Sequence, residues 1–476
     1  MTVDVETSNG GESSAEVPDL FTNMPQSATI DSSTLGCQTL ALGIAANSNY
    51  GKSRPTRESV LQRLSEALMR RSLTKVCTIV TFVYIYRSNW MQIVVHTSLL
   101  LPSLYNHLTV DWKIDLSQRG LQSSDARLVK MALLQNSNLS ILKLGYNNLR
   151  DEGIITLAVG ISAHRTLGSL DLGFNQVGDE GTRALANALF GSALHTLYLA
   201  GNHMGEDGAI ALADVIRRGC ALTKLHLTGN RLGPDGVIGI TEAILEDELR
   251  RKDASNGVKN ARGIQELFLG GTSMGPMGCH AVGTMLSRST TIRVISLANC
   301  GITDEEVAVL AICIKNNREA LPLEALQLSF NAITCKGLDL LTNALWGSQV
   351  IRELLLDNND IGDRGAQQIA NILPYVKTLE VLDVGFNGIK TQGMKALMKV
   401  VAETQHLLSL SVSGNPIDTG TAKAVAYALA YNQSLKSLFL DHCDIQHEGQ
   451  RHIVAGFVSN SGTLLRKLTG FRIGRE

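Results

Sequence analysis

Gly51, Lys52 and Ser53 match the last three residues of the phosphate-binding loop GxxxxGK[ST]. The first glycine of that motif would fall on position 46, which is Ala46. Pro55 also opposes the helix that must follow such a loop, because proline cannot donate a helical hydrogen bond. The segment therefore predicts no nucleotide site.

Histidine and cysteine side chains gather near the C-terminus, where His442, Cys443, His447 and His452 could together suggest a zinc site. His447 and His452 are one residue too far apart for the HExxH pattern, so they do not share one face of a helix. Elsewhere the sequence shows no motif that would pair a nucleophile with a base, and no pair of carboxylates arranged for acid–base catalysis. We expect no metal, no cofactor and no enzymatic activity.

Composition points to a large folded core rather than to a charged partner. The 476 residues are 44% apolar and 18% charged, with a formal net charge of −1, which gives no drive toward nucleic acid or anionic lipid. Eight cysteines lie far apart without a CxxC pair, as expected of reduced thiols. The polar, acidic N-terminus lacks the features of a secretory signal or transit peptide. These features predict a cytoplasmic or nuclear protein without a membrane span.

The frame L-x-x-L-x-L-x-x-N-x-L recurs along the chain, mostly every 28 residues. In each copy the L-x-L core predicts a short strand, and the second half has helical periodicity. Stacked copies would bury one continuous core, with parallel strands on the inner face and helices outside. The copies begin at Leu139, Leu167, Leu194, Leu222, Ile264, Ile292, Leu323, Ile351, Leu379, Leu407 and Leu435.

The motif N-x-(L/I)-G-D-x-G, at Asn175–Gly181 with valine in place of Leu or Ile and at Asn359–Gly365, resembles leucine-rich repeats of the ribonuclease-inhibitor type. The resemblance covers about residues 114–470 and implies a curved α/β leucine-rich-repeat solenoid of about twelve repeats. In that family the ninth-position amides form a buried ladder. Asparagine holds this position in most repeats, with Thr272, Cys300 and Cys443 as the substitutes.

The candidate partner-binding residues lie on the strand face directed away from the core. Large aromatic side chains on an exposed rigid sheet are the residue types that dominate interface energies. We therefore predict that a protein partner binds the concave face, and we interpret Tyr146, Phe174, Phe330 and Phe386, where strands end, as packing between repeats. The predicted contact residues are Lys143, Asp171, Tyr198, Lys224, His226, Glu266 and Phe268.

These features predict a monomeric, non-catalytic scaffold for a protein partner, with no binding of nucleic acid or membrane. The alternative is a small-GTPase regulator, because Ran GTPase-activating proteins resemble this repeat class. Those proteins usually carry a strongly acidic tail, whereas this chain ends in the basic segment RKLTGFRIGRE. The scaffold is the preferred hypothesis.

The flanks of the repeats divide into four segments. We expect disorder over residues 1–55, a capping helix and the start of the first strand over 56–75, repeats over 114–462 and a C-terminal cap over 463–476. About fourteen extra residues lie in the long interval before Ile264. Their charged sequence, around 246–262, predicts a solvated loop or, alternatively, a partner-binding loop.

Residues 76–113 form an anomalous insertion, apolar and without glycine. Joining Lys75 to Ile114 places Leu73 28 residues before Leu139, which restores the repeat period. The 38 codons keep the reading frame, the codon of Val76 begins with GT, and that of Lys113 can end in AG. We hypothesise a retained intron, with a genuine apolar binding loop or membrane contact as the alternative.

Overall fold

The computed structural model describes residues 39–42, 80–87, 90–97, 113–254 and 263–470 of the 476-residue chain. It divides into two compact units, Met1–Asn106 and His107–Glu476. The predicted capping helix at 56–75 lies outside the described residues, as do most of segment 1–55 and the last six residues.

The first unit contains a three-stranded antiparallel sheet in the order β1-β3-β2. Strands β2 (Val80–Arg87) and β3 (Trp90–Thr97) form a hairpin within the anomalous insertion, and their β-branched and aromatic residues favour strands. Strand β1 (Thr39–Leu42) pairs with β3. Four residues of the segment expected to be disordered are therefore in a strand.

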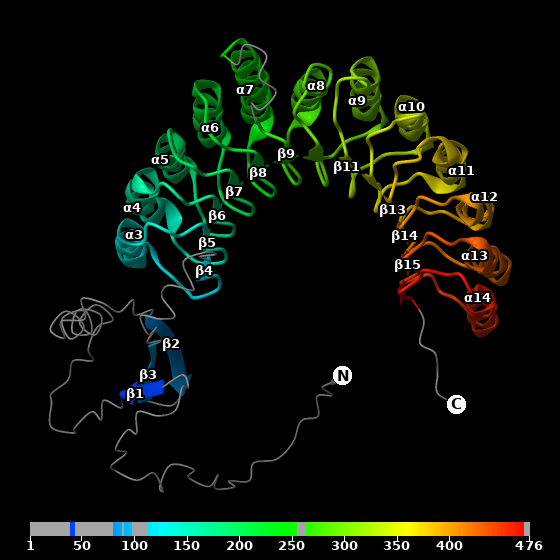
Figure 1. Cartoon of the computed structure of the whole chain (residues 1–476), viewed down its shortest axis with the longest axis horizontal. Helices are drawn as coiled ribbons and strands as arrows, with labels where there is room; N and C mark the ends of the chain where they lie inside the picture. The colour runs from blue at the N-terminus through cyan, green and yellow to red at the C-terminus, as the bar shows by residue number, and fades with distance from the viewer. Residues whose placement is uncertain (1–38, 43–79, 88–89, 98–112, 255–262, 471–476) are drawn as a thin grey trace, which may run out of the picture. The chain divides into compact units, whose positions relative to one another are not determined.

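The second unit is an α/β solenoid, which confirms the predicted fold class. Within residues 113–470, thirteen parallel strands form one sheet in chain order, and a helix joins each strand to the next. The strands line the inner side of a curve and the helices its outer side (Figure 1). Two short 3-10 helices, η1 (Ser123–Asp125) and η2 (Leu373–Tyr375), supplement the α-helices.

The strands of the solenoid are β4 (Lys113–Asp115), β5 (Ile141–Lys143), β6 (Ser169–Asp171), β7 (Thr196–Tyr198), β8 (Lys224–His226), β9 (Glu266–Phe268), β10 (Val294–Ser296), β11 (Ala325–Gln327), β12 (Glu353–Leu355), β13 (Val381–Asp383), β14 (Ser409–Ser411), β15 (Ser437–Phe439) and β16 (Lys467–Leu468). The helices are α3 (Ala126–Gln135), α4 (Arg150–Ala163), α5 (Asp179–Leu189), α6 (Glu206–Arg218), α7 (Gly233–Ala254), α8 (Gly275–Leu286), α9 (Asp304–Asn316), α10 (Cys335–Leu345), α11 (Gly362–Ile372), α12 (Thr391–Glu403), α13 (Thr419–Tyr431) and α14 (His447–Ser459).

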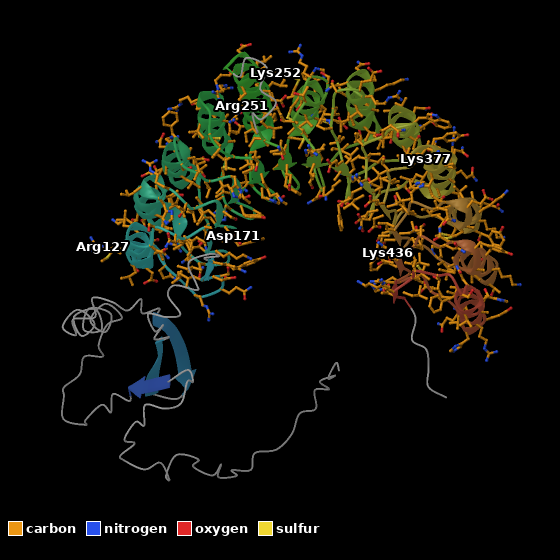
Figure 2. The ribbon with its side chains drawn as sticks, in the orientation of Figure 1. Arg127, Asp171, Arg251, Lys252, Lys377 and Lys436 are labelled. Atoms are coloured by element: carbon orange, nitrogen blue, oxygen red, sulfur yellow. The ribbon has the colours of Figure 1, made fainter. Side chains whose placement is uncertain are left out.

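Most strands of the solenoid follow the alternation that their sequence predicts, the exceptions being β10 and β11, where Ser296 and Ala325 are also buried. In β8 the central Leu225 is buried, whereas Lys224 and His226 on either side face outward and are half-buried. Figure 2 shows Asp171 and Lys436 on the strand side of the solenoid and Arg127 and Arg251 on the helix side. The concave face therefore displays one side chain before and one after each buried leucine.

The ninth-position asparagines form the buried ladder that the family resemblance implies. The Nδ2 of Asn202 donates to the carbonyls of Leu172 and Leu199, and its Oδ1 accepts from the backbone N–H groups of Asn175 and Val177. Where the amide is replaced, Thr272 Oγ1 and the thiols of Cys300 and Cys443 also donate to backbone carbonyls. These polar groups satisfy backbone atoms that would otherwise be buried without partners.

The aspartate of the G-D-x-G motif links its helix to the next repeat in the two copies of the motif. Helix α6 follows Gly205, which has no side chain to cap it, and Asp179 of α5 accepts hydrogen bonds from the N–H groups of Gly205 and Gly208 at 2.7 and 2.9 Å. A Cβ on Gly208 would lie 2.7 Å from Asp179 Oδ1, so the glycine leaves room for this carboxylate. Asp363 caps the start of α12 in the same way.

The charged segment near residue 246 is not the solvated loop that its sequence suggested. Helix α7 continues to Ala254, and only 255–262 lie outside the described residues. Asp247 and Glu248 are each 3% exposed. Their burial is possible because both carboxylates find partners in the protein, which the composition of the segment did not reveal.

Candidate partner-binding surface

Tyr198, His226 and Phe268 lie on the concave face at the same position of three adjacent strands, β7, β8 and β9. The parallel register pairs Tyr198 with His226 and His226 with Phe268. All three side chains are half-buried. The structure therefore brings together the three ring-bearing residues that the sequence analysis selected.

The three rings form a continuous stack. The ring centroids of Tyr198 and His226 are 4.2 Å apart with an interplanar angle of 23°, and those of His226 and Phe268 are 3.9 Å apart at 8°. Adjacent strands are separated by about 4.8 Å, so the sheet itself holds the rings at stacking distance. A partner would meet a rigid aromatic surface whose side chains are already ordered.

An ion pair flanks the stack at the first position of strands β8 and β9. Lys224 Nζ lies 2.5 Å from Glu266 Oε2, and both side chains are about one-third exposed. The pair places one positive and one negative group beside the rings without adding net charge. These polar groups could orient a partner, while the rings supply apolar contact area.

His226 is the central ring of the stack, and its titration follows from its burial. Its Nε2 is enclosed and has no hydrogen-bond partner among the described residues. Burial lowers the pKa of His226 to about 4, and the positive charge of Lys224 acts in the same direction. The ring is therefore neutral at physiological pH and contributes apolar stacking rather than charge.

Lys143 and Asp171 extend the same column but do not join the stack. They pair in register on β5 and β6, and Asp171 lies next to Tyr198. Asp171 Oδ1 accepts a hydrogen bond from the N–H of Gly173 at 3.0 Å, toward the end of its strand. Within residues 113–254 no ion pair joins Lys143 to Asp171, so they border the aromatic surface as separate charges.

Two further ion pairs, which the sequence analysis missed, lie just before the strands of the neighbouring repeats. Arg293 pairs with Glu324, and Arg352 Nη1 lies 2.5 Å from Glu380 Oε1. The four residues occupy the second position of successive frames and alternate in sign. That alternation was the available signal, because equal positions in adjacent repeats become neighbours in the solenoid.

The four aromatic residues at strand ends are all half-exposed, and Tyr146, Phe174 and Phe386 contact neighbouring repeats. Tyr146 stacks on Phe174 with centroids 4.5 Å apart. A Cβ on Gly201 of the next repeat would lie 2.4 Å from the Phe174 ring, so only glycine fits beneath it. The interpretation as inter-repeat packing holds for these contacts.

The histidine-rich C-terminal segment lacks the arrangement of a metal site. His452 Nε2 lies 3.6 Å from Glu448 Oε1, and the Cys443 thiol belongs to the backbone ladder. Among the described residues no three His, Cys, Asp or Glu side chains could jointly hold a metal ion.

The segment Gly51–Ser53, which matches the end of a phosphate-binding loop, lies outside the described residues. In the part of the chain described, no helix combines the length and apolar character needed to cross a bilayer.

Comparison with known proteins supports the repeat assignment. The Leucine Rich repeat family profile matches residues 135–158, 163–186, 193–213, 220–240, 347–370 and 377–398. Leucine-rich repeat-containing protein 73 of Rattus norvegicus and of Homo sapiens are each 28% identical over 124 residues, which is 26% of this chain. The match spans 39% of the length of each of these relatives.

Two solved structures are also similar. An internalin from Listeria monocytogenes aligns with 78% of this chain and 89% of its own, at 17% identity and a TM-score of 0.42. The actin-binding site 2 of leiomodin-1 aligns with 30% of this chain and 84% of its own, at 17% identity and a TM-score of 0.26.

The repeated frame, the stacked strands and helices and the family matches define a leucine-rich repeat protein. Solenoids of this class present extended concave surfaces for binding other proteins. Assignment to the ribonuclease-inhibitor type stays a prediction.

Proposed function

We propose that this chain is a non-catalytic scaffold that binds a protein partner on its concave face, at the aromatic stack of Tyr198, His226 and Phe268. The observation that carries the proposal is the stack itself, three rings in contact on a rigid sheet. A solvated strand face does not require such residues, and burial of ordered aromatic rings is a principal source of interface energy.

The neighbouring charges refine the expected partner. The ion pair of Lys224 and Glu266 offers a donor and an acceptor at the edge of the apolar surface. Asp171 and Lys143 add one charge of each sign on the next two strands. A protein surface with apolar side chains at its centre and mixed polar groups around them matches this arrangement.

The proposal is tested by comparing proteins captured by the full chain and by its variants. Phe268→Ala should lose a captured protein that the unmodified chain retains. The matched control is Tyr375→Ala, because Tyr375 is an exposed aromatic stacked on Trp346 outside the strands. Equal capture by all three proteins would refute binding at the stack.

A turnover assay separates the scaffold from a GTPase regulator. The purified full chain is added to small GTPases loaded with GTP, and phosphate release is measured. We expect no acceleration. Stimulated hydrolysis that is retained in Phe268→Ala would replace the scaffold proposal with a regulatory activity at another surface.

A further inference from the structure

Helix α3, the first helix of the solenoid, exposes an apolar side chain toward the position of a preceding repeat. Leu128 is 53% exposed, whereas the equivalent residues Thr156, Ala184, Ala211 and Gly239 are half-buried. A Cβ at Gly239 would contact Ala213 and Ile210 of the preceding helix, which shows the direction of this position. Met131 and Leu134 of α3 are exposed as well.

The core of the first repeat is open at the same end. Ile114, Leu116 and Leu121 are only partly buried, although their equivalents one repeat later are completely enclosed. Among the described residues, no α-helix precedes α3 and no strand pairs with the outer edge of β4. A leucine-rich solenoid needs a cover at this end, because each terminal repeat otherwise exposes an apolar face.

Residues 56–75 of this chain have the sequence expected of a helix that covers this end of the solenoid. Aligned on α6, the residues Leu61, Leu64 and Leu68 fall at the positions of Ala209, Leu212 and Ile216, which are at most 1% exposed. Both segments then continue through two arginines to Leu-Thr-Lys, at 73–75 and at 222–224, with one residue fewer between Leu68 and Leu73 than between Ile216 and Leu222. The sequence of residues 56–75 therefore predicts the helix of one repeat followed by the start of the next strand.

The insertion separates this segment from the strand that it would begin. Ile114 pairs with Leu142, so Ile114 is the central residue of its strand. Three residues earlier, where the other repeats have a Leu or Ile that is at most 3% exposed, the present chain has Asp111. Joined directly to Ile114, the segment instead supplies Leu73 at this position, and an apolar residue there avoids the cost of burying a carboxylate.

We propose that residues 56–75 dock on α3 and complete the first repeat, and that they do so in a 438-residue form in which Lys75 is joined directly to Ile114. The occupant of the apolar face is thus a segment of this chain. Segment 76–113 then decides whether the solenoid is covered at its N-terminal end. This inference does not depend on the partner-binding site.

The test compares the 476-residue chain with the 438-residue form by hydrogen exchange and thermal unfolding. The backbone amides of α3 should exchange at least about tenfold more slowly in the shorter form, because docking suppresses local opening. Its Tm should rise by about 3 °C or more. Equal exchange at α3, or a shorter form that does not fold, would overturn the proposal.

Substitutions in the 438-residue form identify the docking face. Leu64→Asp should return α3 exchange to the rate of the longer chain, and Leu64→Ala should give an intermediate rate with less risk of unfolding. Ser59→Asp is the matched control, because its equivalent in α6 is the exposed Asp207. Loss of protection with Ser59→Asp, or none with Leu64→Asp, contradicts docking through this face.

Discussion

At the scale of residues, the parallel register places equal positions of successive repeats next to each other on one surface. Tyr198, His226 and Phe268 are 28 and 42 residues apart, yet each is the third residue of its strand and the strands are adjacent. Their contact was predictable from the repeated frame. Their near-parallel ring planes were not, because ring orientation depends on the side-chain rotamers that fit between neighbouring strands.

Removing a ring should affect binding more than folding. Tyr198→Ala and Phe268→Ala are expected to weaken partner capture by roughly tenfold or more, as for central aromatic residues of interfaces. The buried Leu227 provides the contrast, since Leu227→Ala should cost about 2–5 kcal/mol of unfolding free energy. Denaturant unfolding of the three variants is the measurement, and a ring variant as unstable as Leu227→Ala contradicts the assignment.

The neutral imidazole of His226 should make the fold sensitive to acid. Its pKa falls from 6.5 to about 4 on folding, so between these values the unfolded chain binds a proton that the folded chain does not. Stability attributable to this ring is complete above about pH 6.5 and is lost as the pH falls toward 4. With allowance for the half-exposed ring, the loss is about 1–2 kcal/mol.

The variant His226→Phe isolates this contribution, because phenylalanine keeps the stack and does not titrate. Unfolding free energies measured from pH 7 to pH 4 should fall less in His226→Phe than in the unmodified chain. Parallel pH profiles for the two proteins would show that His226 is protonated as readily in the folded as in the unfolded chain.

At the scale of elements, the least predictable contacts join segments that belong to different repeats. Glu248 near the end of α7 accepts hydrogen bonds from Ser289 Oγ, Thr290 N and Thr291 Oγ1 at 2.5, 2.9 and 2.8 Å. Asp247 beside it pairs with Arg250 and Arg251. A charged run without periodicity resembles a solvated loop, and nothing in its composition indicates partners some forty residues later.

Loss of the Glu248 carboxylate should therefore destabilise the solenoid. Glu248→Ala leaves buried hydroxyl and N–H groups without their acceptor, which we expect to cost about 1–3 kcal/mol in chemical denaturation. Glu246→Ala is the matched control, since the Glu246 side chain is exposed and should contribute less than about 0.5 kcal/mol. Equal effects in the two variants would indicate that α7 does not dock through Glu248.

The aspartate caps between repeats make a similar prediction at a different junction. Asp179→Ala removes the acceptor of two N–H groups at the start of α6 and should lower the unfolding free energy by about 1 kcal/mol. Glu180→Ala, at the neighbouring exposed position, should leave it nearly unchanged. Thermal unfolding of the two variants gives the comparison, and a smaller Tm loss for Asp179→Ala than for Glu180→Ala contradicts the cap.

At the scale of the whole molecule, the repeat period determined nearly all of the fold of the second unit, although not the antiparallel sheet of the first. The repeated frame predicted where the strands lie, which residue of each strand faces the core and the order of the strands in the sheet. This was possible because every repeat contacts only its neighbours. The frame also placed Ile114, the residue directly after a segment that breaks the pattern, opposite Leu142 one period later. Contacts such as those of Glu248 could not be predicted in this way, since they occur once and follow no period.

The same period makes a prediction about the message that encodes the chain. Removal of segment 76–113 restores a 28-residue spacing between Leu73 and Leu139, and its codons permit splice sites at both ends. We therefore expect mature transcripts in which the codon of Lys75 is followed directly by that of Ile114. Sequencing of transcripts across this junction is the measurement. If every mature transcript contains the 38 codons, the segment is a genuine insertion, and its hairpin of β2 and β3 is a constant part of the protein.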